Sequence, residues 1–184
     1  MKDGSGKFRV ESAEVLYAGE GIVTVDAATV AALVRDGLRN ARHRIRLCTH
    51  TDARDAVHEM IIVHDRSCYV RPHKHLGKSE SFHVIEGEVD VVIFDDVGRV
   101  SDVIPMGPYG SDKPFFYRIA EPLYHTLLIR SDVLVFHETT SGPFRREQTV
   151  LAPWSPVDST AEVQRYRKEL VAAVAEKLSA RARS

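Results

Sequence analysis

The stretch 72–87, PHKHLGKSESFHVIEG, predicts a β-strand, a tight turn and a second β-strand. His73 and His75 are two residues apart, so on a strand both imidazole rings point to the same face. Gly77 can adopt a positive φ in the intervening turn. The chain then enters the second strand at Glu80, whose carboxylate can turn back toward the two rings. Two imidazoles and a carboxylate that converge on one point are typical ligands of a divalent transition metal.

The alternation of apolar and polar residues continues on both sides of this stretch. From about residue 57 the chain is a series of short segments rich in Val, Ile, Phe and Tyr, separated by Gly, Asp, Ser or Pro. The segments are EMIIVHD (59–65), SCYVRPH (67–73), ESFHVIEG (80–87), EVDVVIFDD (88–96), GRVSDVIPM (98–106), KPFFYRI (113–119), HTLLIRS (125–131) and DVLVFHE (132–138). No helical pattern interrupts them, which argues against a parallel α/β sheet. The sequence therefore predicts a mainly β fold, an antiparallel sandwich or β-barrel such as a jelly roll.

Two helical segments flank the predicted barrel. Residues 27–40 carry apolar side chains at helical spacing and follow Asp26, a favourable N-cap residue. Residues 159–179 carry a second apolar stripe that would cover the barrel or a partner subunit, and Ser159 with Glu162 fits a capping box. We expect four parts: a lead-in with one helix (1–50), the barrel (51–140), an irregular arm anchored by Trp154 (141–157) and a C-terminal helix (158–184).

The composition argues against several classes of function. The chain has 25 Lys and Arg residues against 26 Asp and Glu residues, whereas a nucleic-acid partner requires a basic surplus. No apolar run of about 18 residues is present, and the N-terminus lacks the apolar region of a secretory signal, so we expect no membrane partner. The two cysteines, Cys48 and Cys68, make no disulfide framework. A reduced, cytoplasmic setting is therefore expected.

His125 is the fourth candidate ligand of the metal. It follows a proline turn, Pro122–His125, about 45 residues after Glu80, and an eight-stranded roll can return it to the side of the first pair of histidines. Three imidazoles and one carboxylate leave open positions on a six-coordinate ion, which is typical of reactive or ligand-binding metals rather than structural ones. We expect one divalent transition metal per chain. The ligand types do not choose among Zn, Fe, Mn and Ni.

Other polar residues are candidates for a ligand pocket. His137 and Glu138 alternate on the last predicted strand, so only one of them faces inward. Arg71, Lys74 and Lys78 flank the metal strand, where a cation can bind a carboxylate or phosphate; the alternative for each is a solvated charge at the rim.

A basic cluster and three further histidines have structural as well as functional interpretations. The cluster consists of Arg35, Arg39, Arg42, Arg44 and Arg46. It is either a solvated face, or one or two of its members line the mouth of an anion site. His83 should face away from the metal because it lies three residues after Glu80 on the same strand. His50 and His64 have no partner motif, and we interpret them as structural or solvated.

These motifs resemble those of a known superfamily. The pattern HxH, four residues, Glu, six residues, Gly in 73–87 is similar to the first cupin motif. Pro122–His125 resembles the second cupin motif, with a shorter spacing and without its glycine. A closer resemblance, over about residues 44–158, is to the WbuC family of cupin-fold metalloproteins. It rests on RPHKHLGKSE (71–80), IEG (85–87), VIFDDVGRV (92–100), the proline-preceded histidine and SGPFRREQTVLAPWSP (141–156).

The resemblance implies a cupin β-barrel with a metal at the four candidate ligands, and it favours Glu138 as the inward-facing residue. Members of the family occur beside genes for surface-polysaccharide and O-antigen sugar synthesis, which implies a sugar derivative or another small polar anion as the ligand. We predict Lewis-acid chemistry of the isomerase type, with Glu138 and Lys78 as the catalytic residues. The alternatives are an iron- or manganese-dependent dioxygenase and a non-catalytic sugar- or metabolite-binding module. We also expect a homodimer formed through outer strands and end segments.

Overall fold

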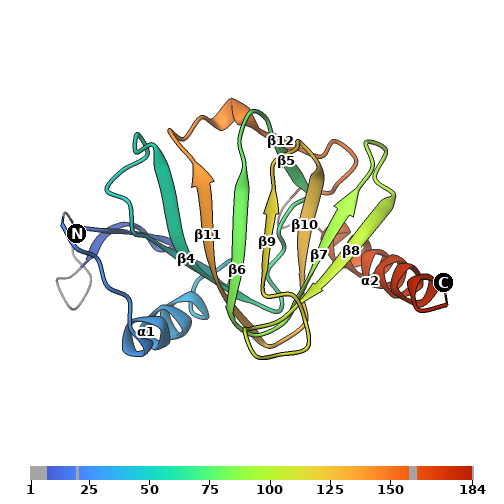
Figure 1. The fold of residues 1–184 in the computed structure, drawn as a ribbon, viewed down its shortest axis with the longest axis horizontal. Coiled ribbons are helices and arrows are strands. Elements are labelled where there is room, and N and C mark those ends of the chain that lie inside the picture. The colour runs from blue at the N-terminus through green and yellow to red at the C-terminus, as the bar shows by residue number, and fades with distance from the viewer. Residues whose placement is uncertain (1–7, 20, 158–160, 184) are drawn as a thin grey trace.

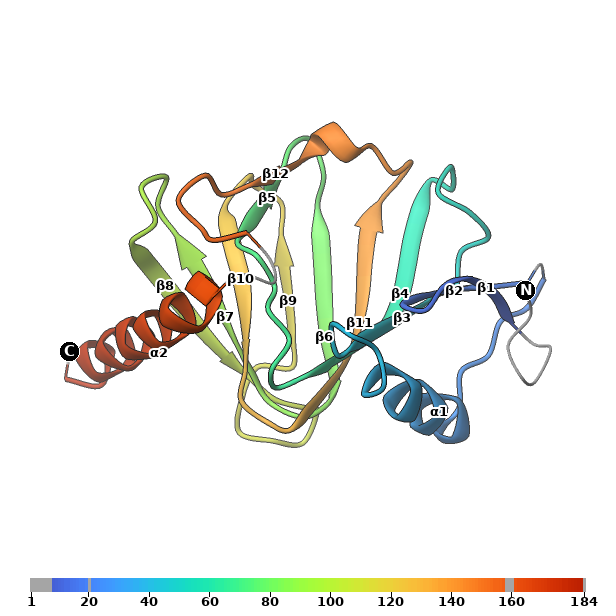
Figure 2. The same cartoon turned by 180° about the vertical axis from the view of Figure 1, so that it is seen from behind.

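The structure is a computed structural model that describes residues 8–19, 21–157 and 161–183 (Figure 1). These residues form two β-sheets, with α1 (Ala27–Gly37) at one end of the molecule and α2 (Ala161–Arg181) at the other, as both views show (Figure 1, Figure 2). The mainly β fold class predicted from the sequence, with an N-terminal and a C-terminal helix, is confirmed. Within the described residues, no helix has both the length and the apolar character needed to cross a bilayer.

The larger sheet contains strands from the whole length of the chain. They are β1 (Phe8–Ser12), β2 (Val15–Ala18), β3 (Arg44–Cys48), β4 (Val57–Asp65), β6 (Glu80–Glu86), β9 (Phe116–Ile119) and β11 (Val133–Ser141). The order across the sheet is β1-β2-β3-β4-β11-β6-β9. The sheet is not wholly antiparallel as predicted, because β2 and β3 run parallel and α1 lies in the connection between them. The N-terminal part of the chain therefore extends the sheet by three strands.

The smaller sheet carries the histidine strand. It contains β5 (His73–His75), β7 (Val89–Phe94), β8 (Val100–Met106), β10 (Tyr124–Ile129) and β12 (Thr149–Leu151), in the order β12-β5-β10-β7-β8. All of its pairs are antiparallel.

The prediction of a strand over 67–73 is wrong for most of its length. Only His73 of this segment lies in a strand, as the first residue of β5. Pro72 has no N–H to donate to a ladder, and the carbonyl of Val70 accepts a hydrogen bond from the Thr126 hydroxyl instead. The other seven predicted segments each contain a strand.

The two sheets stay separate, so the predicted closed barrel is corrected to an open roll of two sheets. Their inner faces meet in one hydrophobic core. Phe82 and Phe136 of the larger sheet stack at 4.3 Å between ring centroids, and both are almost fully buried. Val91 and Met106 of the smaller sheet complete the core from the opposite side. Burial of apolar surface between the sheets therefore holds the roll together.

Both helices pack through the apolar positions that the sequence indicated. The N–H of Thr29 donates to the Asp26 carboxylate at 2.8 Å, which confirms Asp26 as the N-cap of α1. Leu170 and Val174 of α2 pack on the smaller sheet of the same chain. Of the two alternatives for this stripe, covering the chain's own sheet is the one observed. The expected capping box at Ser159 lies outside the described residues.

The arm after β11 is held to the smaller sheet by Trp154, as expected. It contains a short 3₁₀ helix, η1 (Arg146–Gln148), and then β12. The Trp154 ring lies 5.0 Å from that of Phe94 and 5.8 Å from that of Tyr124. Gly98, in the β7–β8 turn, has a φ of +89°, and a Cβ there would come within 2.7 Å of the indole. This turn therefore requires glycine both for its backbone conformation and for the contact with Trp154.

Candidate metal centre

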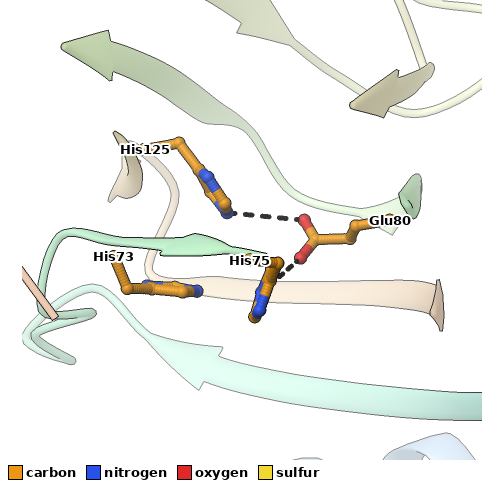
Figure 3. A group of neighbouring side chains, drawn as sticks. All are labelled: His73, His75, Glu80 and His125. Carbon is orange, nitrogen blue, oxygen red and sulfur yellow. Dashed lines mark ion pairs between the residues drawn. The ribbon is translucent and has the colours of Figure 1, made fainter. Parts of the chain in front are cut away.

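The four predicted ligands come together from three strands of the two sheets. His73 and His75 project from β5, His125 lies directly opposite His73 on β10, and Glu80 begins β6. Figure 3 shows all four side chains pointing toward one centre. Gly77, with a φ of +64°, lies in the turn that carries the chain from β5 to β6 and so from one sheet to the other. The strand–turn–strand stretch of the sequence thus brings Glu80 back to the histidines, as predicted.

The distances within this group fit a single cation. One potential ligand atom from each residue lies within 4.8 Å of all the others. Nε2 of His75 is 3.1 Å from Oε2 of Glu80, and Nε2 of His125 is 3.7 Å from Oε1 (Figure 3). The ring centroid of His73 is 5.0 Å from that of His75 and 4.7 Å from that of His125. An ion with bonds of about 2 Å to nitrogen and oxygen can lie among atoms at such separations.

Backbone carbonyls orient two of the three imidazole rings. Nδ1 of His73 lies 2.9 Å from the carbonyl oxygen of Arg71, and Nδ1 of His125 lies 2.9 Å from that of Leu123. A carbonyl only accepts, so each Nδ1 carries a proton and donates it, which leaves Nε2 as the atom that can bind a metal. This second layer of contacts is the usual support of a metal-binding histidine.

Glu80 is a buried carboxylate that is ionised. Its exposed fraction is 6%. Burial raises the pKa of Glu80, but hydrogen bonds with His125 and His75 outweigh it and hold the pKa well below 4.5. The Tyr117 hydroxyl donates a further hydrogen bond of 2.8 Å to Oε1. A buried negative charge needs a compensating cation.

Burial and hydrogen bonding set the protonation of two of the three histidines. Burial lowers the pKa of His73 to about 4, with a further contribution from His125, so its ring is neutral at pH 7. The pKa of His125 is raised, because its hydrogen bond to Glu80 outweighs the effect of burial. A divalent cation at this point would take over the role of that proton in neutralising Glu80. The residues present therefore fit a bound divalent metal.

A cavity of about 420 Å³ adjoins the metal group. It is lined by Tyr17, Arg46, Cys48, His50, Ala53, His58, Met60, His73, His75, Lys78, Glu80, Glu138, Thr140, Phe144 and Thr149. Both predicted catalytic residues, Glu138 and Lys78, lie in its wall. Burial, together with the nearby charge of Glu80, raises the pKa of Glu138 to about 8, so its carboxyl group holds a proton at pH 7.

Several other candidate residues lie away from the cavity. The Arg71 guanidinium donates to the carbonyls of Ala152 and Ser155 and so ties the arm to β5. Lys74 pairs with Asp96 at 3.2 Å. Arg42 and Arg44 both bind Glu14.

Of the basic cluster at residues 35–46, Arg46 alone is among the residues that line the cavity. His83 and His137 pair across β6 and β11 on the outer face of the larger sheet, so His83 faces away as expected. His64 is buried against Phe136.

The sequence analysis named Arg46 of β3 as one candidate for an anion site, but it missed the parts of the cavity wall that β2 and β4 supply. His50 and His58 lie there with their rings stacked at 4.2 Å, whereas we had interpreted His50 as structural or solvated. The signal for His58 was present: it continues the alternation of Met60 and Ile62 by one more step, onto the inner face. Tyr17 lies in a segment with no distinctive motif, and only the docking of β2 beside β3 brings it to the cavity.

Comparisons with known proteins match parts of the chain. A family model described as a domain of unknown function (DUF6016) matches residues 25–106, which is less than half of the chain. No curated protein matches. Among solved structures, the protein SO0799 from Shewanella oneidensis is similar over 56% of this chain and 66% of its own, with a TM-score of 0.45 and 9% identity.

Two further solved structures are similar to this chain. Oxalate decarboxylase from Bacillus subtilis matches over 53% of this chain and 24% of its own, with a TM-score of 0.41 and 18% identity. An RmlC-like cupin family protein with a double-stranded β-helix fold, from Methanocaldococcus jannaschii, matches over 56% of this chain and 84% of its own, with a TM-score of 0.41 and 16% identity. The chain spans less than two thirds of the first two of these three structures. The resemblance to cupins and to the WbuC family stays a prediction from the sequence.

Proposed function

We propose that the protein is a metalloprotein that binds one divalent transition metal at His73, His75, Glu80 and His125 and a small polar ligand in the adjoining cavity. The observation that carries this proposal is the convergence of four ligand atoms within 4.8 Å of one another beside a cavity of about 420 Å³. Four protein ligands leave two positions on a six-coordinate ion. A ligand in the cavity has access to those positions.

The proposed chemistry is an isomerisation of the ligand. When bound, the ion supplies Lewis acidity toward a carbonyl or hydroxyl group. Glu138 is the proposed proton-transfer group, because its raised pKa of about 8 lies near neutral pH, where a general acid or base is most effective. Lys78 is the second proposed catalytic residue, and its ammonium group would neutralise charge on the ligand.

The proposed ligand is a sugar derivative of surface-polysaccharide (O-antigen) metabolism. The pathway rests on the resemblance of the sequence to the WbuC family. The cavity supports a sugar by its composition: polar groups line it together with the ring of Phe144, 58% exposed, which offers an apolar surface. We also propose a homodimer. Because the apolar stripe of α2 already packs on its own sheet, the dimer would form through other surfaces.

Metal analysis of the purified protein tests the proposal. We expect about one ion per chain in the wild type, and loss of the ion in the double variant His73→Ala/His75→Ala. The control is His83→Ala, which removes an imidazole from the outer face of the same sheet as Glu80 and should leave the metal content unchanged. Full metal occupancy in the double variant would reject the assignment.

Activity assays separate the proposed isomerase from its alternatives. Sugar acids and sugar phosphates are incubated with the metal-loaded protein and followed by NMR, and we expect turnover that Glu138→Gln abolishes without loss of metal. Oxygen uptake by the iron-loaded protein would instead assign the site to a dioxygenase. Saturable binding of these compounds without turnover would assign it to a non-catalytic binding module.

A further inference from the structure

We infer that the ligand of this cavity is an anion, and that Lys78, His58 and Arg46 bind its carboxylate or phosphate group in the part of the cavity away from the metal. This inference rests on the proposed function, because it concerns the ligand of the same cavity. It gives Lys78 a role in ligand binding.

The inner face of the larger sheet connects the metal to this second region. Thr140 on β11 is paired with Glu80 on β6 at one side and with His58 on β4 at the other. His58 is therefore two strands from Glu80, a distance of about 10 Å between backbones. Arg46 lies on the next strand, β3, opposite Ile62 and so four residues along β4 from His58. A ligand that reaches from the ion to these residues has the length of a small substituted molecule such as a sugar acid or sugar phosphate.

The charges that line the cavity favour an anion. Arg46 and Lys78 are its two cationic side chains, and neither has an ion-pair partner within the described residues. Glu80 and Glu138 are its two carboxyl groups. The positive charge of a divalent ion and the two cationic side chains exceeds the negative charge of the two carboxylates, even when both carboxyl groups are ionised. The low-dielectric wall strengthens the attraction of this positive excess for an anionic ligand.

Two buried polar atoms in the same wall have no partner. Nε2 of His58 and Oγ1 of Thr140 lack a hydrogen bond within the described part of the chain. Buried polar atoms are almost always hydrogen-bonded, and these two belong to residues that line the cavity. A threonine hydroxyl can donate to an anion, and a histidine ring can do so from a nitrogen that carries a proton. His58 itself is only 5% exposed.

The surroundings of His58 hold its ring in place before any ligand arrives. The ring stacks on His50 at 4.2 Å with an angle of 8° between the planes. Nδ1 of His50 in turn contacts the backbone of Glu59 at 3.1 Å. Gly142 covers the ring at such close range that a Cβ there would lie 2.8 Å from Nε2. A group fixed in this way loses little conformational freedom on binding.

Calorimetric titration of the metal-loaded protein tests the inference. The probes are inorganic phosphate and glucuronate, one for each type of acidic group, with uncharged glucose for comparison. We expect saturable binding of at least one anion, weakened at least about tenfold in Lys78→Gln and in Arg46→Gln. His58→Phe keeps an aromatic ring against His50 and removes both nitrogen atoms, and it should also weaken binding. Lys74→Gln removes the same charge outside the cavity and should bind like the wild type.

The outcomes separate this inference from the proposed metal function. If anion binding persists in Lys78→Gln and Arg46→Gln but is lost in His73→Ala/His75→Ala, the anion sits on the ion alone and the inference is wrong. Binding of glucose without either anion, or no binding at all by a folded, metal-loaded wild type, would also overturn it. If anions bind through Lys78 to a protein that takes up no metal, the inference holds and the proposed function fails.

Discussion

The hydroxyl group of Tyr117 donates a hydrogen bond of 2.8 Å to Oε1 of Glu80, the carboxylate of the candidate metal centre. Tyr117 lies on β9, at the edge of the larger sheet, and its ring stacks on Phe82 at 5.2 Å. The hydrogen bond therefore links the hydrophobic core to the orientation of a metal ligand.

Replacement of Tyr117 by Phe should weaken metal binding. The variant keeps the ring and its stacking but leaves Oε1 of Glu80 without this donor, and loss of such a supporting contact typically lowers metal affinity about 10- to 100-fold. Competition with a chromophoric chelator measures the Zn²⁺ affinity. The control is Tyr109→Phe, at a ring that is 81% exposed, which should leave the affinity unchanged. Equal affinities of Tyr117→Phe and wild type would show that the hydroxyl does not support Glu80.

His64 should make the protein less stable in acid. Burial lowers its pKa from 6.5 to about 3, with a further contribution from Arg44. Between these values the unfolded chain binds a proton at His64 and the folded chain does not, so stability falls as the pH falls. Two pH units below 6.5, at pH 4.5, the loss is about 2–3 kcal/mol.

Urea unfolding of His64→Leu at pH 7 and pH 4.5 measures this loss. The variant should gain stability relative to the wild type on going from the higher to the lower pH. Ile62→Val, on the same face of β4, replaces no titrating group and should differ from the wild type by the same amount at both pH values. An equally steep loss of stability in His64→Leu would assign the acid sensitivity to other groups.

Gly98 should tolerate alanine much less well than Gly110. Both have φ values near +90°, so alanine costs about 1 kcal/mol of backbone strain at each. A Cβ at Gly98 would also clash with Trp154, whereas a Cβ at Gly110 would have no atom within 4 Å. We expect Gly98→Ala to lose about 1–3 kcal/mol more than Gly110→Ala. Urea unfolding followed by the fluorescence of Trp154 gives both values, and equal losses would disprove the steric contribution.

Removal of the Arg71 side chain should release the arm from β5. Arg71 donates to the Ser155 hydroxyl at 3.0 Å and to the backbone carbonyls of Ala152 and Ser155. Arg71→Ala should cost about 2 kcal/mol of stability and expose the arm to limited proteolysis. Arg118→Ala, at an exposed position on β9, is the control. Unchanged cleavage of the arm in Arg71→Ala would show that Trp154 and β12 suffice to hold it.

The sequence was most informative where local spacing and sheet periodicity agree. The HxH spacing, the turn at Gly77 and the strand beginning at Glu80 predict the convergence of three ligands without any knowledge of long-range contacts. The assignment of His125 needed the assumption that a distant strand returns beside β5, and the register of β10 confirms it. Seven of the eight segments that apolar alternation predicts likewise contain a strand.

The parts that sequence reasoning missed depend on contacts between distant segments. The roll stays open rather than closed because its strands divide between two sheets, and alternation within one strand carries no information about which partner it takes. The short strands β2 and β3 can pair in parallel because α1, which lies between them in the sequence, brings the chain back to the same end of the sheet. As a result, the place of Tyr17 in the cavity wall follows from tertiary structure and not from any local pattern, and the choice of Arg46 from the basic cluster depends on the same docking.

The ligands of the metal and the opposite wall of the cavity come from different regions of the chain. β5, β6 and β10 carry the ligands, whereas β2, β3 and β4 carry Tyr17, Arg46 and His58. Replacement of the N-terminal strands should therefore change the ligand specificity of the cavity without changing its metal binding. Libraries that vary residues 15–18 and 44–60 offer a route to new selectivity on an unaltered ion-binding frame.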